Sequence, residues 1–116
     1  YPVGYIYRKA VADYITEDAK SKGFPCIGIT YITMPGENVG FRYFFYLNNI
    51  HLIHPSNSVP VYNIVLPFQY SLNEVKKRFG VIGIIPPAKF PSKEDLDKVC
   101  ESPNTNLTDS LFGYVE

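Results

Sequence analysis

Three short apolar runs, at residues 26–33, 61–67 and 80–85, constrain the fold of this chain most strongly. Each run has beside it a stretch in which apolar residues recur at helical spacing. Alternation of strand-like and helix-like periods is typical of an α/β domain. Because the runs are almost continuously apolar, we expect strands that are covered on both faces. The sequence therefore predicts a three-layer α/β/α fold around a small, mostly parallel sheet of three to five strands.

Two helices are expected in the first half of the chain. Residues 5–22 predict a helix that ends at Gly23, since glycine adopts the left-handed cap conformation without strain. The aromatic run at residues 39–48 suits either a strand or a buried helix, and we favour a helix that begins after Asn38. The apolar positions of the first helix fall on one stripe, formed by Tyr7, Val11, Tyr14 and Ile15.

A third helix is expected after the second apolar run. Ser71 and Glu74 have the spacing of a capping box, which predicts a helix over residues 71–79. Its buried face is expected to carry Leu72 and Val75, with Phe79 one turn further on. The basic residues 76–78 would then complement the dipole at the end of that helix.

A length of 116 residues suits one domain over residues 1–116. Residues 86–116 form a Pro-rich C-terminal arm, in which Ser92 is expected to cap one short helix. The segment at residues 111–115 suits an added edge strand. The chain begins with Tyr1 rather than Met, and we interpret it as a piece excised from a longer protein, in which a targeting or membrane segment could precede it.

Charge and aromatic content limit the classes of partner. The chain has 11 basic and 11 acidic residues, so it lacks the positive charge typical of nucleic-acid binding, and no nucleic-acid partner is expected. It contains 10 Tyr and 8 Phe but no Trp. Tyrosines are frequent on surfaces that pack against partners, and they also cover thin cores. Composition alone does not separate these two interpretations.

The two cysteines leave two alternatives open. In an oxidising compartment Cys26 and Cys100 would pair and tie the C-terminal arm to the first strand. In a reducing compartment Cys26 would be a small buried apolar residue and Cys100 a free thiol. The triplet at Asn106 matches the N-glycosylation pattern, which also occurs by chance.

No motif predicts catalysis, a metal or a cofactor. His51 and His54 are spaced as H-x-x-H, but no acidic or cysteine ligand lies at a matching distance, and a metal site needs three or four ligands. No serine lies in a G-x-S-x-G turn, and neither cysteine lies at the start of a helix. We therefore assign no catalytic residue, no metal ligand and no cofactor, and interpret the two histidines as loop residues.

The turn after the first strand is the one candidate ligand site. It contains Gly36, Glu37, Asn38, Gly40 and Arg42 at a junction between a strand and a helix. Ligands of open α/β sheets bind beyond the carboxyl ends of strands, where backbone amides and a nearby arginine hold anions. An ordinary tight turn would have the same composition, and the glycine patterns of nucleotide-binding loops are absent.

Four short segments carry a resemblance to a known family. They are residues 9–15 (KAVADYI), 18–20 (DAK), 37–46 (ENVGFRYFFY) and 61–65 (VYNIV). Their succession resembles the soluble tail that follows the last transmembrane helix of polytopic glycosyltransferases of the dolichyl-phosphate-mannose protein mannosyltransferase type. The similarity spans residues 7–85 and rests on short motifs.

The resemblance implies a parent enzyme that transfers a sugar from a lipid-phosphate donor, with catalytic acidic residues in loops outside this chain. This chain would be a non-catalytic domain on the extracytoplasmic face of a membrane. It would assist acceptor binding or assembly, and its partners would be the transmembrane portion of the parent and a glycan or lipid-linked sugar. The alternative is a free-standing ligand-binding or sensor domain with an anion or sugar pocket at the turn after the first strand. A small cytosolic α/β enzyme ranks last.

Overall fold

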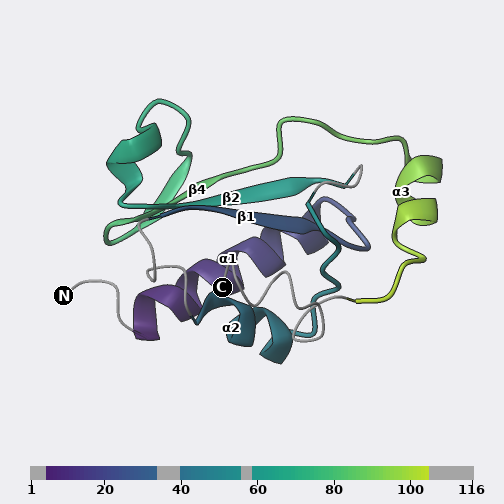
Figure 1. Cartoon of the computed structure of the whole chain (residues 1–116), viewed down its shortest axis with the longest axis horizontal. Coiled ribbons are helices and arrows are strands. Elements are labelled where there is room, and N and C mark those ends of the chain that lie inside the picture. Colours follow the sequence, from purple (N-terminus) through teal and green to yellow (C-terminus); the bar gives the residue numbers. More distant parts are fainter. Residues whose placement is uncertain (1–4, 34–39, 56–58, 105–116) are drawn as a thin grey trace.

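One sheet of four strands organises the chain, and the computed structural model describes residues 5–33, 40–55 and 59–104. The strands lie in the order β1-β2-β4-β3 (Figure 1). No helix within these ranges is long and apolar enough to cross a membrane. The elements follow one another as α1 (Tyr5–Ser21), β1 (Gly28–Thr33), α2 (Phe41–Leu47), β2 (Val61–Leu66), the 3-10 helix η1 (Phe68–Ser71), β3 (Lys77–Phe79), β4 (Ile82–Ile85) and α3 (Lys93–Val99).

The sheet is mixed, so the α/β class is confirmed and the expectation of a mostly parallel sheet is wrong. β1 pairs in parallel with β2, from Gly28 opposite Val61 onward. β4 is antiparallel to both β2 and β3. Only Gly80 and Val81 connect β3 to β4, and a two-residue connection joins antiparallel strands, since a parallel pair needs a crossover of a dozen residues or more.

The three-layer arrangement is also wrong. α1 and α2 lie on the same face of the sheet, and α3 lies beyond one end of it (Figure 1). On the other face η1 contacts β2 and β4. Thr30 and Asn63 are paired across β1 and β2, and their half-buried side chains hydrogen-bond to each other. These two polar residues interrupt the apolar runs on that face, where η1 but no α-helix packs within the described ranges.

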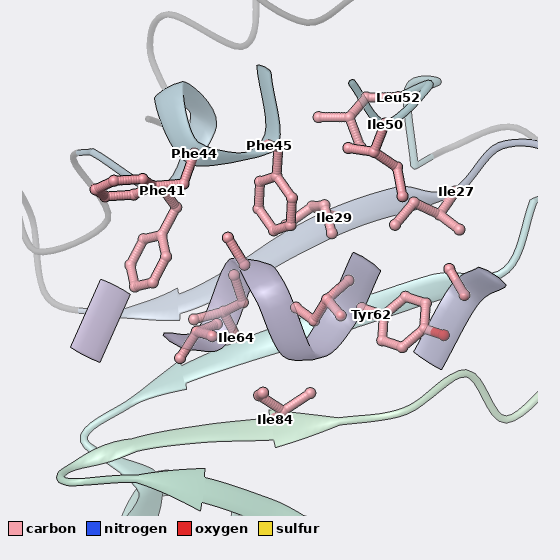
Figure 2. Close-up of a cluster of buried hydrophobic side chains, with 14 of the residues drawn as sticks. Ile27, Ile29, Phe41, Phe44, Phe45, Ile50, Leu52, Tyr62, Ile64 and Ile84 are labelled. Carbon is pink, nitrogen blue, oxygen red and sulfur yellow. The ribbon is translucent and has the colours of Figure 1, made fainter. Parts of the chain in front are cut away.

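The main core fills the space between the sheet and the two helices. Figure 2 shows side chains from the sheet and from α2 gathered around α1. The predicted stripe of α1 is confirmed at Val11 and Ile15, which are fully buried, whereas Tyr7 is exposed. The other large buried side chains of this core include Ile29, Phe41, Phe45, Tyr62, Ile64, Ile82 and Ile84.

Glycines mark the end of α1 and the start of α2. After α1, Gly23 has φ of 75°, and the N–H of Phe24 donates to the carbonyl of Ala19 at 3.0 Å. The helix over the aromatic run is confirmed as α2. Its N-cap is Gly40, with φ of 101°, whereas the predicted cap Asn38 lies outside the described residues. A left-handed residue at this position favours glycine.

The predicted helix over residues 71–79 is wrong. This region contains η1, a turn and the edge strand β3, in which Lys77 lies opposite Ile84 of β4. Leu72, expected in the core, is 60% exposed. The capping-box spacing was outweighed by strand pairing, because Gly80, with φ of 60°, begins the tight turn that folds β3 back onto β4.

The C-terminal arm is attached to the sheet at several points. Ser92 caps α3 as predicted, accepting a hydrogen bond from the N–H of Asp95 at 3.2 Å. Cys100, which follows α3, forms a disulfide with Cys26, and the two Cα atoms are 5.6 Å apart. Leu96 packs into a second core cluster with Cys26. The segment at 111–115 lies outside the described residues, as does the triplet at 106–108.

Beyond the disulfide, the arm is held by the side chain of Asn104, which makes two hydrogen bonds of the kind that a neighbouring strand would make. The segment after α2 pairs in parallel with the residues before β1, through a bridge between Leu52 and Ile27. Asn104 then accepts from the N–H of Leu52 and donates to the carbonyl of Ile50, both at 3.1 Å. The backbone of this segment is thus hydrogen-bonded on both sides.

Candidate functional site

The predicted ligand turn is described only in part. Gly36, Glu37 and Asn38 lie outside the described residues. Gly40 is the N-cap of α2, and Arg42 lies in the first turn of that helix with 8% of its surface exposed. Arg42 is therefore largely buried beside the turn.

A second arginine, absent from the sequence-based prediction, lies at the same place. A Cβ atom on Gly40 would lie 3.4 Å from the Cδ of Arg8, so the arginine side chain runs directly over this glycine. The guanidinium carbon of Arg8 lies 5.4 Å from the centre of the Phe41 ring. Tyr31, near the carboxyl end of β1, contacts the same ring. Arg8 was missed because nothing local in the sequence indicates that α1 reaches this end of the sheet.

A polar pocket lies where α1 meets the end of α2. Its volume is about 280 Å³, and it is lined by Asp13, Thr16, Glu17, Lys20 and Asn48. The amide nitrogen of Asn48 donates to Oδ1 of Asp13 at 2.9 Å and to Oγ1 of Thr16 at 3.2 Å. The residues of this pocket are not among the site residues predicted from the sequence, because Asn48 is more than thirty positions away from Asp13 and Thr16.

The carboxylate in this pocket is held in its ionised form. Lys9 donates to Oδ2 of Asp13 at 2.7 Å, and this hydrogen bond lowers the pKa of Asp13 below its usual 3.8. Partial burial acts in the opposite direction, and the Asn48 hydrogen bond and the Lys9 charge lower the pKa further. The pocket thus combines an anion, an amide, a hydroxyl and an ammonium group. Such a set of donors and acceptors is suited to binding the hydroxyl groups of a polar ligand.

A second acidic residue of α1 has a structural role. The phenol of Tyr62, buried on β2, donates to Oδ2 of Asp18 at 2.5 Å. Lys22 forms an ion pair with the same oxygen at 2.9 Å. Burial raises the pKa of the Tyr62 phenol above its usual 10.0, and the hydrogen bond to Asp18 raises it further.

The two histidines occupy the segment after α2. Nε2 of His51 lies 2.8 Å from the carbonyl oxygen of Ser102 in the arm, and His54 is partly buried. In the described part of the chain, no group of three His, Cys, Asp or Glu side chains is placed to hold a metal ion.

Two of the polar regions described bear on ligand binding. One is the polar pocket lined by Asp13 and Asn48. The other is the start of α2, where the Arg8 side chain passes over Gly40 and Arg42 lies in the first turn of the helix. They lie at opposite ends of α2, since Gly40 precedes that helix and Asn48 follows it. Comparison with protein families, with characterised proteins and with solved structures found no match for this chain.

Proposed function

We propose that this chain is a non-catalytic domain on the extracytoplasmic face of a membrane glycosyltransferase-like protein. The observation that carries this proposal is the disulfide between Cys26 and Cys100. Disulfides persist in oxidising compartments and are rare in the cytosol, so this bond supports a location outside the cytoplasm. The class of the parent protein rests on the resemblance over residues 7–85. The domain assists acceptor binding or assembly with the transmembrane portion.

The polar pocket supports a role for this domain in binding a sugar. Asp13 and Asn48 in its wall are fixed by hydrogen bonds, while Glu17 and Lys20 are exposed. The Asn48 amide nitrogen already donates to Asp13 and Thr16, so the pocket offers a glycan the carboxylate and amide oxygens as acceptors and the exposed Lys20 ammonium as a donor. The pocket is therefore the place where we expect an acceptor glycan or a lipid-linked sugar to bind.

A ligand screen tests this role. Acceptor glycans and lipid-linked sugar analogues are added to the chain, and the thermal unfolding midpoint is measured, since a ligand that binds the folded state raises it. Asn48→Ala should abolish the shift. Asp97→Asn, an exposed carboxylate on α3, is the matched control and should keep it. An unchanged shift in Asn48→Ala would contradict glycan binding in this pocket.

The sequence of the full gene tests the proposed class of the parent protein. If the proposal is right, the coding sequence that precedes Tyr1 specifies several apolar segments of about 20 residues, each long enough to cross a bilayer. A single signal peptide or a DNA-binding helix-turn-helix in that position would contradict it and would favour a free-standing sensor.

The second candidate is a free-standing domain that binds an anion or a sugar at the turn after β1. The observation in its favour is that the side chain of Arg8 from α1 passes over Gly40, the N-cap of α2, and that Arg42 lies in the first turn of α2. Anions such as sulfate should then raise the unfolding midpoint, and Arg42→Ala should remove the effect. Because Arg42 is buried, Arg8→Gln serves as the second variant. A midpoint shift that both variants retain would exclude this site.

A further inference from the structure

The turn between η1 and β3 brings exposed apolar and basic residues together. Tyr70 is 54% exposed and Leu72 is 60% exposed. Lys76, Lys77 and Arg78 follow and are also exposed. We call these five residues the basic edge. It lies at the end of the sheet away from α3, where η1 stands above the sheet (Figure 1).

The three cations have no acidic partner within the described ranges of the chain, where the ion pairs are Lys9–Asp13 and Lys22–Asp18. Arg78 lies over the Phe68 ring at 4.5 Å, and Lys77 lies over the Phe79 ring at 5.3 Å. Glu74 is the one acidic residue between Ser71 and the end of β3, so the basic edge is positive on a chain whose net charge is zero.

Protection of the sheet edge accounts for only part of this pattern. β3 is one of the two edge strands of the sheet, and lysines on an edge strand discourage pairing with another chain. That role explains the cations. It does not account for the exposure of Leu72, which lines a pocket together with the cations, or of Tyr70 two residues earlier.

A shallow pocket joins the two kinds of residue. Its volume is about 300 Å³, and its walls include Phe68, Leu72 and Val75 together with the three cations. Apolar walls next to cations match the two parts of a phospholipid, whose anionic headgroup lies beside the start of its acyl chains. Tyrosine is suited to the same interface, since its ring is apolar and its hydroxyl is hydrated.

We infer that the basic edge docks onto a bilayer surface that contains anionic phospholipids. The cations attract the headgroup phosphates, and Leu72 and Tyr70 enter the boundary between headgroups and acyl chains. Three cations and two apolar side chains give weak, reversible binding, which suits a surface that orients the chain against a membrane. The inference does not depend on the proposed function, because it concerns only these residues and lipid.

A fluorescent reporter tests the inference directly, since the chain contains no Trp. In Leu72→Trp the sole tryptophan lies in the basic edge. In Leu47→Trp it lies on α2, where Leu47 is 55% exposed, so this variant is the matched control. We expect a blue shift of Leu72→Trp emission with vesicles of phosphatidylglycerol and phosphatidylcholine, and none with phosphatidylcholine alone. No blue shift, or an equal one in Leu47→Trp, would overturn the inference.

A charge variant measures the electrostatic part. Each cation near an anionic surface strengthens binding about fivefold, so the triple variant Lys76→Gln, Lys77→Gln and Arg78→Gln should lower the vesicle partition coefficient of the chain about a hundredfold. An unchanged partition coefficient would overturn the inference.

Two further arms complete the test. Replacing Lys89, Lys93 and Lys98, which are exposed around α3, with Gln removes the same charge elsewhere and should leave most of the binding intact. An equal loss in this control would contradict a specific surface. Binding of soluble polyglutamate, with no response to anionic vesicles, would assign the basic edge to an acidic protein partner instead.

Discussion

Tyr62 and Asp18 join the sheet to α1 through a hydrogen bond of 2.5 Å between the phenol and Oδ2 of the carboxylate. Tyr62 lies on β2 with its ring in the main core, and Asp18 lies in the last turn of α1. The carboxylate also pairs with Lys22. This contact fixes the position of α1 along the sheet, and with it the position of Asp13 and the polar pocket one turn earlier.

Removing the phenol should therefore destabilise the chain without a change of fold. We expect Tyr62→Phe to lower the free energy of unfolding by about 1–3 kcal/mol, because a partly buried hydrogen bond to a charged group is lost. Tyr46→Phe, which alters a tyrosine that is 54% exposed, should change it by less than about 0.5 kcal/mol. Chemical denaturation of both variants gives the comparison, and equal values would contradict the structural role of this bond.

The raised pKa of the Tyr62 phenol predicts that the free energy of unfolding falls at alkaline pH. Because the pKa of Tyr62 is raised on folding, its contribution to stability is complete below pH 10.0 and is lost as the pH rises further. The free energy of unfolding should fall more steeply above pH 10 in the parent chain than in Tyr62→Phe. Denaturation curves at neutral and alkaline pH measure the two slopes, and parallel slopes would contradict the assignment.

The lowered pKa of Asp13 predicts that its contribution to stability is lost in acid. Its pKa is lowered on folding, so its contribution is present above the usual 3.8 and is lost as the pH falls through the folded value. Lys9→Gln should raise the Asp13 pKa toward 3.8, since the Lys9 hydrogen bond is the main cause of the shift. An NMR titration of the Asp13 carboxyl carbon measures both values. An unchanged pKa in Lys9→Gln would show that Lys9 does not hold this carboxylate.

The packing around Gly83 leaves too little room for a side chain at this position of β4. A Cβ atom at this position would lie 2.8 Å from Cβ of Phe68 and 2.8 Å from Cγ2 of Val75. Gly83→Ala should lower the free energy of unfolding by about 1–3 kcal/mol, because the covering residues must move. Adding Val75→Ala should recover part of this loss. If the two substitutions are simply additive, Val75 does not cover Gly83 in solution.

How far the sequence predicts this structure depends on the range of the interactions. The helix of α1, the strand β2 and the cap of α3 at Ser92 follow from local periodicity and capping. The edge strand β3 does not follow from local patterns. Ser71 and Glu74 have the spacing of a helix start, and only the pairing of β3 with β4 shows that this segment is a strand. The Gly80–Val81 turn was the available signal, since a glycine-led two-residue turn between alternating residues is typical of a hairpin.

The candidate site was harder to predict than the fold. The glycines and Arg42 after β1 are recognisable from sequence, but Arg8 reaches the same place from a helix more than thirty residues earlier. Asn48 and Asp13 meet only because α2 packs beside α1. Contacts of this kind arise from tertiary packing, which leaves no local pattern.

The disulfide between Cys26 and Cys100 should stabilise the fold. Linking Cys26 to Cys100 closes a loop with a sequence separation of 74, so reduction should lower the free energy of unfolding by about 4 kcal/mol in the chain-entropy description. Thermal unfolding with and without reductant measures this loss. Cys26→Ala with Cys100→Ala is the control, and reductant should not alter its unfolding midpoint.

The decisive measurement is made on the protein as its own cells produce it. Intact cells are treated with a membrane-impermeant lysine reagent, the thiols are alkylated without reduction, and the peptides are analysed by mass spectrometry. We predict that exposed lysines such as Lys93 are labelled before lysis and that Cys26 and Cys100 are recovered as one linked peptide pair. Two alkylated cysteines, with lysines that react only after lysis, would contradict an extracytoplasmic domain.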